Sequence, residues 1–368
     1  MRGRARRFCT LRRASTSVGF VRLGVRYDGV IERLAATLNL APFPVGLSMF
    51  GMAVARSVQI AQRVGVFAEL ARTDATASDV ARRLGLREQG TRRLLDVLVA
   101  AGHLRLKRGE RYELAPRAAK WLDPGSGRYV GDFIADTAGF WDWWGELEPL
   151  IREGRSVEMH DRPSDDPFWR TYILGQYELA RLASKAVARA VRLPRDATSV
   201  LDIAGGHGEY AMALCRRHDG LRATVVDLPG SAAIGREIVT NAGMSGRVQH
   251  VEGDMFTAHL GGPHDGALAF NIVHHLSPEQ ARRLFARVAA SLRPGAPLCV
   301  LDLYDRPAGK RPAAGSYLGL FFHLTSGADT YAKADVAEWI TRSGFGPVKA
   351  RNLGQAPGQA LLRAERTA

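Results

Sequence analysis

The feature that most restricts the fold of this chain is an alternation of short apolar segments with amphipathic segments, which begins near residue 198. Five apolar segments have the length and composition of strands: SVLDIA, RATVVDL, VQHVEGDMF, ALAFNIV and PLCVLDLYD. Two more, GPVKARNLG and QALLRAE, are joined by a turn that contains Gly and Pro and predict an antiparallel hairpin. Residues 198–368 are therefore predicted to form a Rossmann-like, doubly wound α/β domain with a seven-stranded sheet whose last strand is antiparallel.

A glycine-rich turn, within LDIAGGHGEYAMAL at residues 201–214, connects the first of these strands to a helix. Backbone without side chains lets a ligand come close, and ligands of doubly wound sheets bind at the carboxyl ends of the strands. The segment from Gly206 to Ala211 fits the GxGxxA fingerprint of dinucleotide sites, and Asp227 stands where a ribose-binding acid is expected. No GK[ST] sequence follows, so the turn is not a Walker phosphate loop.

Acidic residues at neighbouring strand ends distinguish between the possible ligands. Asp227 ends the second strand in VVDLP, Asp254 ends the third in EGDMF, and an Arg-Pro-Gly turn precedes the fifth. Two acids are better suited to a ligand that carries a sulfonium cation and no phosphates than to one that carries a negatively charged pyrophosphate. Its carboxylate can still use backbone amides near a helix N-terminus. The pattern therefore favours S-adenosylmethionine (SAM) over a nicotinamide cofactor.

The preceding residues predict a mainly helical domain over residues 27–122. Within it, a helix that begins at Thr76 or Ser78, a second amphipathic helix and an alternating hairpin around Arg108-Gly109 have the pattern of a winged helix. One interpretation is DNA binding and the other is a scaffold or dimerisation module, and the pattern alone favours neither. In the DNA-binding interpretation the recognition helix would present Arg87, Arg92 and Arg93.

Residues 123–197 are predicted to be a helical linker that contributes to the substrate pocket. The segment GFWDWWGELEPLIREG carries three tryptophans, which either line an aromatic pocket or fill a core. They are Trp141, Trp143 and Trp144.

The charge of the chain is concentrated at its start. Residues 1–26 carry eight arginines and no acid, so that removing them reduces the net charge from +14 to +6. We predict a basic, disordered tail there. Three distant cysteines fit neither a disulfide framework nor a metal site and indicate a reducing compartment, and no apolar run is long enough for a membrane span.

Taken together, LDIAGGHGEY, VVDLP, EGDMF, FNIVHHLSPEQ and LRPGAPLCVLD behind a winged helix resemble the SAM-dependent small-molecule O-methyltransferases, over roughly residues 45–365. These include plant caffeic-acid-type, hydroxyindole and bacterial natural-product enzymes. One departure is Ala204, where the family has the first glycine of the loop. The resemblance implies SAM as cofactor, a small-molecule acceptor, a cytoplasmic homodimer formed through the winged helix, and no nucleic-acid or membrane partner. We expect cofactor contacts from Asp202, Gly205, Gly206, Gly208, Asp227, Leu228, Asp254, Met255, Phe256 and Asn271.

Paired histidines precede a helix that should begin at Pro278, because Ser277 and Gln280 form a capping box. A histidine with a pKa near ~6.5 can take the proton of an acceptor hydroxyl as the new bond forms. By resemblance, His274 matches the family's catalytic histidine, and His275 stands at the family's aspartate position. Asp302 and Asp329 match the two glutamates that orient this histidine in the plant enzymes, although both side chains are shorter.

The remaining expectations concern the acceptor pocket and the reaction. The expected lining residues are Trp141, Phe168, Tyr172, His275, Phe322 and His323. Phe321 could form a substrate wall with Phe322 and His323, and Met159 and Trp169 are weaker pocket candidates. We predict a SAM-dependent methyltransferase that acts on a hydroxyl of an aromatic or polyketide-like molecule in secondary metabolism, with a histidine as general base. The alternatives are methyl transfer to carbon or nitrogen, because fold does not fix the acceptor atom, and a winged-helix regulator whose SAM-like domain senses a ligand.

Overall fold

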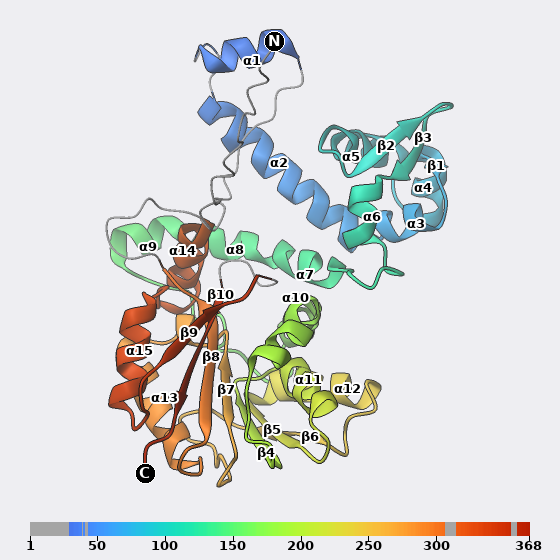
Figure 1. The fold of residues 1–368 in the computed structure, drawn as a ribbon. Coiled ribbons are helices and arrows are strands. Elements are labelled where there is room, and N and C mark those ends of the chain that lie inside the picture. The colour runs from blue at the N-terminus through green and yellow to red at the C-terminus, as the bar shows by residue number, and fades with distance from the viewer. Residues whose placement is uncertain (1–28, 39, 41–42, 306–313, 355–358) are drawn as a thin grey trace, which may run out of the picture.

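A computed structural model describes residues 29–38, 40, 43–305, 314–354 and 359–368 (Figure 1). The predicted basic tail, residues 1–26, lies outside the described residues. The C-terminal part of the chain folds around one sheet, and the N-terminal helices lie above it in Figure 1. No helix in the described part of the chain is long and apolar enough to cross a membrane.

The predicted seven-stranded sheet is confirmed, in the order β6-β5-β4-β7-β8-β10-β9. Neighbouring strands from β6 to β8 are parallel, and the last strand, β10, runs antiparallel to both β8 and β9. The central strands are buried on both faces, which explains their near-continuous apolar sequences. The strands are β4 (Ser199–Ile203), β5 (Arg222–Asp227), β6 (Val248–Glu252), β7 (Ala267–Phe270), β8 (Pro297–Leu303), β9 (Lys349–Asn352) and β10 (Gln359–Glu365).

Helices cover both faces of this sheet and form two apolar cores. One core contains residues of α10 (Phe168–Ala190), α11 (Glu209–Arg217) and α12 (Pro229–Asn241). The other contains residues of α13 (Pro278–Ala290) and α15 (Lys333–Arg342). This is the doubly wound arrangement that the alternating sequence predicts.

The capping box at the start of α13 is present. The Ser277 hydroxyl accepts from the Gln280 N–H at 3.2 Å, and the Gln280 side chain accepts from the Ser277 N–H at 2.8 Å. These bonds satisfy two backbone donors that a helix start leaves open. They fix where α13 begins, and therefore where the short 3-10 helix η2 (Val273–His275) ends.

The N-terminal domain contains the predicted winged helix. Helix α4 begins after Thr76, whose hydroxyl accepts from the Asp79 N–H, and ends at Gly85 in a left-handed conformation. A separate apolar core joins its elements. These elements are α2 (Phe43–Arg63), α3 (Val66–Arg72), β1 (Ala75–Thr76), α4 (Ala77–Leu84), α5 (Glu88–Ala100), β2 (Leu104–Lys107) and β3 (Arg111–Leu114).

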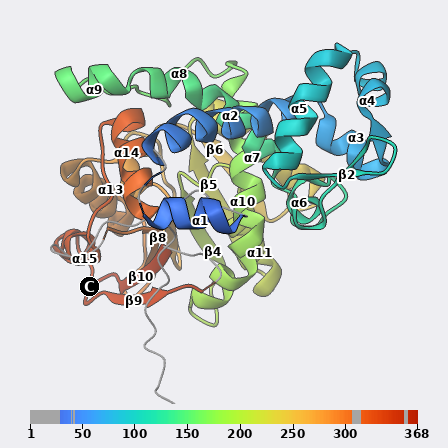
Figure 2. The same cartoon turned by 90° about the horizontal axis from the view of Figure 1, so that it is seen from above.

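Short helices connect the two domains. A small aromatic core packs part of this connection against α14 (Ala314–Ser326). Trp143 belongs to this core, so the structure places it in packing and not in a pocket. Helix α1 (Val30–Thr37) and helix α2 lie across the molecule when it is seen from above (Figure 2). The connecting elements are α6 (Pro116–Leu122), α7 (Gly131–Asp136), η1 (Thr137–Gly139), α8 (Phe140–Gly145) and α9 (Leu147–Glu153).

Candidate active site

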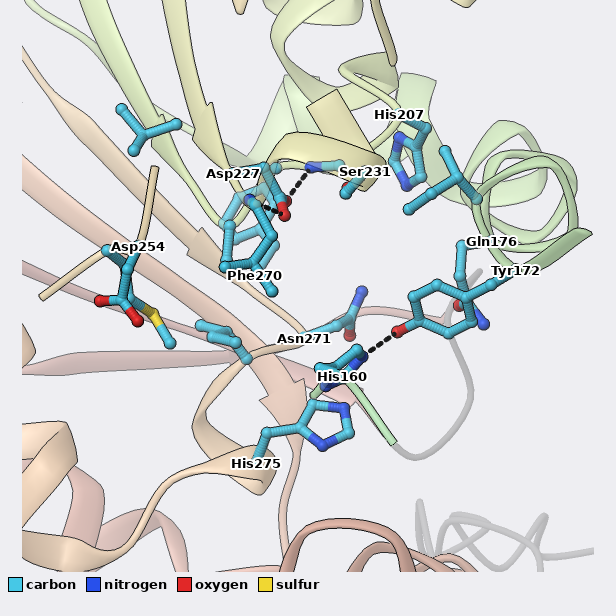
Figure 3. Close-up of a pocket in the computed structure, with 18 of the residues that line it drawn as sticks. His160, Tyr172, Gln176, His207, Asp227, Ser231, Asp254, Phe270, Asn271 and His275 are labelled. Carbon is cyan, nitrogen blue, oxygen red and sulfur yellow. Dashed lines mark hydrogen bonds between the residues drawn. The ribbon is translucent and has the colours of Figure 1, made fainter. Parts of the chain in front are cut away.

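A cavity of about 440 Å³ lies where β4, β5 and β7 end, beside the glycine turn (Figure 3). Its size falls within the range of roughly 300–1,000 Å³ found for small-molecule and cofactor sites. All the residues expected to contact the cofactor line this cavity except Gly208. Gly208 instead precedes α11 with a φ of 69°, a left-handed conformation that glycine adopts without strain.

The glycine turn brings bare backbone to the cavity. A Cβ at Gly205 would lie 2.5 Å from the Asp202 carboxyl carbon, so only glycine fits there. The Gly206 N–H donates to Asp227 at 2.7 Å, which ties the turn to the end of β5. Ala204, the departure from the family pattern, adopts a φ of 53°, a left-handed conformation that non-glycine residues rarely adopt.

Asp202 is a buried acid with no cation beside it. Its side chain is fully buried, and neither carboxylate oxygen has a hydrogen-bond partner of acceptable geometry. Burial, followed by the neighbouring Asp227, raises the pKa of Asp202 to about 8, and the nearby Ala211 N–H offsets only part of this rise. Such a group is costly unless a donor or a cation reaches it.

The described lining residues include several acids but no lysine or arginine. The acids are Glu158, Asp161, Asp202, Asp227 and Asp254. A pyrophosphate would find no cationic side chain among these described residues, whereas a sulfonium and an ammonium group would find carboxylates. The residues present therefore fit SAM, and they would hold it between the glycine turn and the loop after β6.

The loop after β6 forms another side of the cavity. Asp254 is exposed and accepts from the Phe256 N–H at 2.6 Å. Asn271, at the end of β7, accepts from Gln359 of β10 at 2.7 Å and has a φ of 53°. These contacts orient two polar side chains at positions where the sequence predicts cofactor contacts.

His274 is held by Asp302. Its Nδ1 lies 2.5 Å from the Asp302 carboxylate, and its ring stacks on Phe322 with the ring centres 3.8 Å apart. Because a carboxylate accepts, Nδ1 carries a proton, and in the neutral form of the ring Nε2 then has the free lone pair. Asp302 also accepts from the Val273 and Leu303 N–H groups at 2.9 and 2.7 Å, so its position is fixed. This arrangement suits a general base and its orienting acid.

His275 lines the cavity, whereas His274 lies behind it. His275 Nδ1 is 3.2 Å from the Ser326 hydroxyl, which itself donates to the Phe322 carbonyl. The hydroxyl proton is thus in use, so Nδ1 of His275 donates and its Nε2 is also a free acceptor. His160 faces His275 with ring centres 4.9 Å apart and bonds to the Tyr172 hydroxyl at 3.2 Å.

His160 and His275 are both neutral. Burial, aided by the charge of neighbouring groups, lowers the pKa of His160 to about 4 and that of His275 well below its ordinary value. In Figure 3 these two rings lie on the side of the cavity opposite Asp227 and Ser231. This side is therefore available to an acceptor whose hydroxyl needs a hydrogen-bond acceptor.

The structure does not bring several expected residues to the cavity. The Trp141 indole N–H donates to Gln59 of α2, and Phe168 stacks on Tyr172 beside the small aromatic core. His323 bonds to the Ala328 carbonyl at the end of α14. Asp329 is exposed and accepts from the Thr330 N–H, so the expected contact with His274 is replaced by a local turn.

Of the other pocket candidates, Tyr172 and Trp169 line the cavity, while Met159 and Phe321 belong to the aromatic core. Sequence reasoning missed His160 and His207, which also line it. His160 comes from an irregular segment without periodicity, so its sequence gave no signal. His207 lies inside the glycine turn, where a polar side chain between two glycines is a sequence signal for a position at the cavity.

Comparisons with known proteins give the family. A family model described as an O-methyltransferase domain matches residues 153–346, and one described as an O-methyltransferase dimerisation domain matches residues 47–124. The second match covers the winged helix, so it favours dimerisation over DNA binding. Arg92 also pairs with Glu110 at 3.0 Å, so one of the arginines of the DNA-binding interpretation is engaged within the domain.

Relatives with assigned activities span most of the chain. A 3-hydroxy-5-methyl-1-naphthoate 3-O-methyltransferase of Streptomyces sahachiroi is 26% identical, over 81% of this chain and 88% of the relative. The tetracenomycin polyketide synthesis 8-O-methyl transferase of Streptomyces glaucescens is 30% identical, over 80% and 88%. Human N-acetylserotonin methyltransferase, solved with SAM, has the same fold, with a TM-score of 0.77 and 18% identity over 94% of this chain and 100% of that one.

Proposed function

Since the chain belongs to the family of SAM-dependent O-methyltransferases, we propose that its acceptor is an aromatic or polyketide-like small molecule whose hydroxyl is methylated with a histidine as general base. The observation that carries this proposal is a pair of histidines at a cavity lined by acids: His275 lines the cavity, and His274 lies directly behind it, with ring centres 4.3 Å apart, and is oriented by Asp302. The names of the Streptomyces relatives, which act on a naphthoate and on a polyketide, support the acceptor class.

His274 is the proposed base and Asp302 its positioning residue. When bound, SAM supplies an electrophilic methyl group. To be deprotonated by His274, the acceptor hydroxyl would have to reach this ring past the adjacent ring of His275, whose centre is 4.3 Å away. His274 Nε2 then takes the proton, and Asp302 stabilises the resulting imidazolium through Nδ1–H. His275 Nε2 and His160 hydrogen-bond the acceptor from the cavity side, and Trp169 and Tyr172 exclude water there. Because the base has to take the proton only as the bond to the methyl forms, a neutral imidazole suffices.

The test compares His274→Asn with His275→Asn, because the two rings are adjacent and both have a free Nε2. Methyl-labelled SAM and a panel of hydroxylated naphthoates and aromatic polyketides serve as substrates. We expect His274→Asn to lower kcat by about 10²–10⁴-fold and His275→Asn mainly to raise the acceptor KM. A kcat loss confined to His275→Asn would move the base to that residue. SAM binding without any labelled ether product would contradict the acceptor class.

The described α1 and α2 present an apolar face to solvent, and we propose that a second copy of the chain covers it. Large apolar side chains on these helices are more than half exposed, among them Ile31 at 81% and Phe50 at 61%. Contiguous apolar surface of this kind marks an interaction site. The match of residues 47–124 to a dimerisation domain, which includes most of α2, supports a homodimer.

A further inference from the structure

His160 and Tyr172 form a hydrogen-bonded pair at the wall of the cavity. The His160 Nε2 atom lies 3.2 Å from the Tyr172 hydroxyl oxygen, and both side chains line the cavity. In Figure 3 this bond lies on the same side of the cavity as His275, away from Asp227 and Ser231. The pair is therefore placed to contact the acceptor and not the cofactor.

The protein holds this pair in position without a ligand. The Met159 N–H donates to the Thr325 carbonyl of α14 at 3.0 Å, which fixes the irregular segment that carries His160. The ring of His160 lies nearly parallel to that of Trp169, with ring centres 6.2 Å apart and an angle of 17° between them. Tyr172 is part of the long helix α10. A rigid element therefore carries one member of the pair, and a tethered segment carries the other.

The protons of the pair determine what it can offer to a ligand. Burial lowers the pKa of His160 to about 4 and raises the pKa of Tyr172 well above its ordinary value, so both side chains are neutral at pH 7. Together they carry one imidazole N–H and one hydroxyl O–H. Their mutual bond uses one of these protons, and neither group has another side-chain partner among the described residues. Whichever side chain donates within the pair, one donor stays free.

His275 offers the complementary group beside this donor. Its Nδ1 donates to the Ser326 hydroxyl, which leaves Nε2 as a free acceptor. The ring centres of His160 and His275 are 4.9 Å apart, and the rings are almost perpendicular. The described lining residues include no lysine or arginine. A ligand on this side therefore meets one neutral donor and one neutral acceptor, and no cation that would hold a carboxylate.

We propose that the acceptor carries a neutral carbonyl oxygen ortho or peri to the hydroxyl that is methylated, and that the His160–Tyr172 pair donates to this carbonyl while His275 Nε2 accepts from the hydroxyl. This inference rests on the proposed function and narrows its substrate class. Two oxygens that share an internal hydrogen bond lie roughly 2.5–3.0 Å apart, so both can reach two neighbouring rings. A carboxylate in place of the carbonyl would face the acids of the cavity without a compensating cation.

The arrangement also has a consequence for the hydroxyl. In a molecule of this class the hydroxyl donates to its own carbonyl, which withholds the proton from a base. The bonds from the His160–Tyr172 pair and to His275 Nε2 replace this internal bond, so the proton becomes available. A phenol without the neighbouring carbonyl leaves the free donor of the pair without a partner, which costs affinity. Neither member of the pair takes the proton itself.

The test is calorimetric titration of the full-length chain, saturated with S-adenosylhomocysteine, with two isomers of a hydroxytetralone. One isomer has the hydroxyl peri to the ketone, and the other has it on the far side of the same ring. The double variant His160→Phe/Tyr172→Phe removes both possible donors, whereas each single variant leaves one. We expect the double variant to bind the peri isomer about 10- to 100-fold more weakly and the other isomer within about threefold of wild type. Each single variant should lose less.

Tyr177→Phe is the matched control, because it removes a hydroxyl from the same helix at a position that does not line the cavity. It should leave the ratio of the two affinities unchanged. An equal loss of both isomers in the double variant would overturn the proposal, because the pair would then only shape the wall. Unchanged binding of the peri isomer would overturn it as well.

A second comparison tests the neutral carbonyl. A naphthol with a peri acetyl group should bind more tightly than the naphthol with a peri carboxylate, and the reverse order would overturn this part of the proposal. Failure of the proposed function gives a different result, because these titrations need no turnover. It would appear as tight binding of the peri isomer without transfer of a labelled methyl group from SAM.

Discussion

At the residue scale, two buried aspartates show how neighbours decide the role of a side chain. Asp302, at the end of β8, accepts from His274 and from two backbone N–H groups. Asp202, in β4, has no such partner for either of its oxygens. Both are almost fully buried, with exposures of 1% and 0%. The same residue type thus orients a histidine in one place and has its pKa raised to about 8 by burial in the other.

Asp302 and Asp329 provide a matched pair for testing the orienting acid. We expect Asp302→Asn to lower kcat by about 10²–10⁴-fold, because the amide would donate to His274 Nδ1 and favour the wrong tautomer. Asp329→Asn should leave kcat within about twofold, since Asp329 is exposed and bonds only to a local N–H. Steady-state kinetics with the best acceptor of the panel measure both.

The affinity of each variant for S-adenosylhomocysteine is the control for folding and should match that of the wild type. A large loss in Asp329→Asn, with Asp302→Asn unaffected, would contradict the assignment of the orienting acid.

At the element scale, the start of α13 controls the segment that carries both histidines. The chain leaves β7 at Phe270, forms η2, and enters α13 at Pro278. The capping box leaves little freedom at the second boundary, because two reciprocal hydrogen bonds fix it. A local sequence signal therefore contributes directly to the geometry of the site.

Substitutions at two helix N-caps can distinguish an effect on stability from an effect on activity. Ser277 caps α13 beside the histidines, and Thr76 caps α4 in the winged helix. We expect Ser277→Ala and Thr76→Ala each to lower the free energy of unfolding by about 0.5–2 kcal/mol, measured by urea denaturation. Only Ser277→Ala should also lower kcat, by several-fold, because only that cap positions His274. Equal kcat values in the two variants would show that η2 holds the histidines without help from the cap.

At the scale of the whole molecule, the packing of α1 and α2 leaves apolar surface that a single chain does not cover. Helix α2 packs on the winged helix and on α7, yet much of its N-terminal half faces solvent. In Figures 1 and 2 both helices lie outside the catalytic domain and cover neither face of its sheet. A second copy of the chain that buried this apolar surface would stabilise a dimer through the hydrophobic effect.

Charge on this surface should therefore disrupt assembly. We expect the wild-type chain to elute as a dimer and the double variant Phe50→Glu/Met52→Glu as a monomer, measured by size-exclusion chromatography with light scattering. Val251→Glu, on the edge strand β6, is the control and should remain dimeric. A dimeric double variant would place the interface elsewhere.

The sequence by itself determined the seven strands, the antiparallel end of the sheet, the winged helix, the start of α13 and three of the acids around the cofactor cavity. Each of these follows from local physics: side-chain periodicity, capping, the conformational freedom of glycine, and the rule that parallel strands end at one edge. These signals lie within a few residues of one another, so a single sequence carries them.

Only the tertiary structure decided which residues line the cavity. Of the paired histidines it places His275 there, it adds His160, and it leaves out Trp141 and Asp329. His274 and His275 are neighbours in sequence, but Asp302 and Phe322 hold one ring behind the cavity while Ser326 holds the other in it. Side-chain direction in such a segment is set by partners from distant strands and helices. No local pattern records those partners, because the hydrogen bonds exist only after the chain has packed.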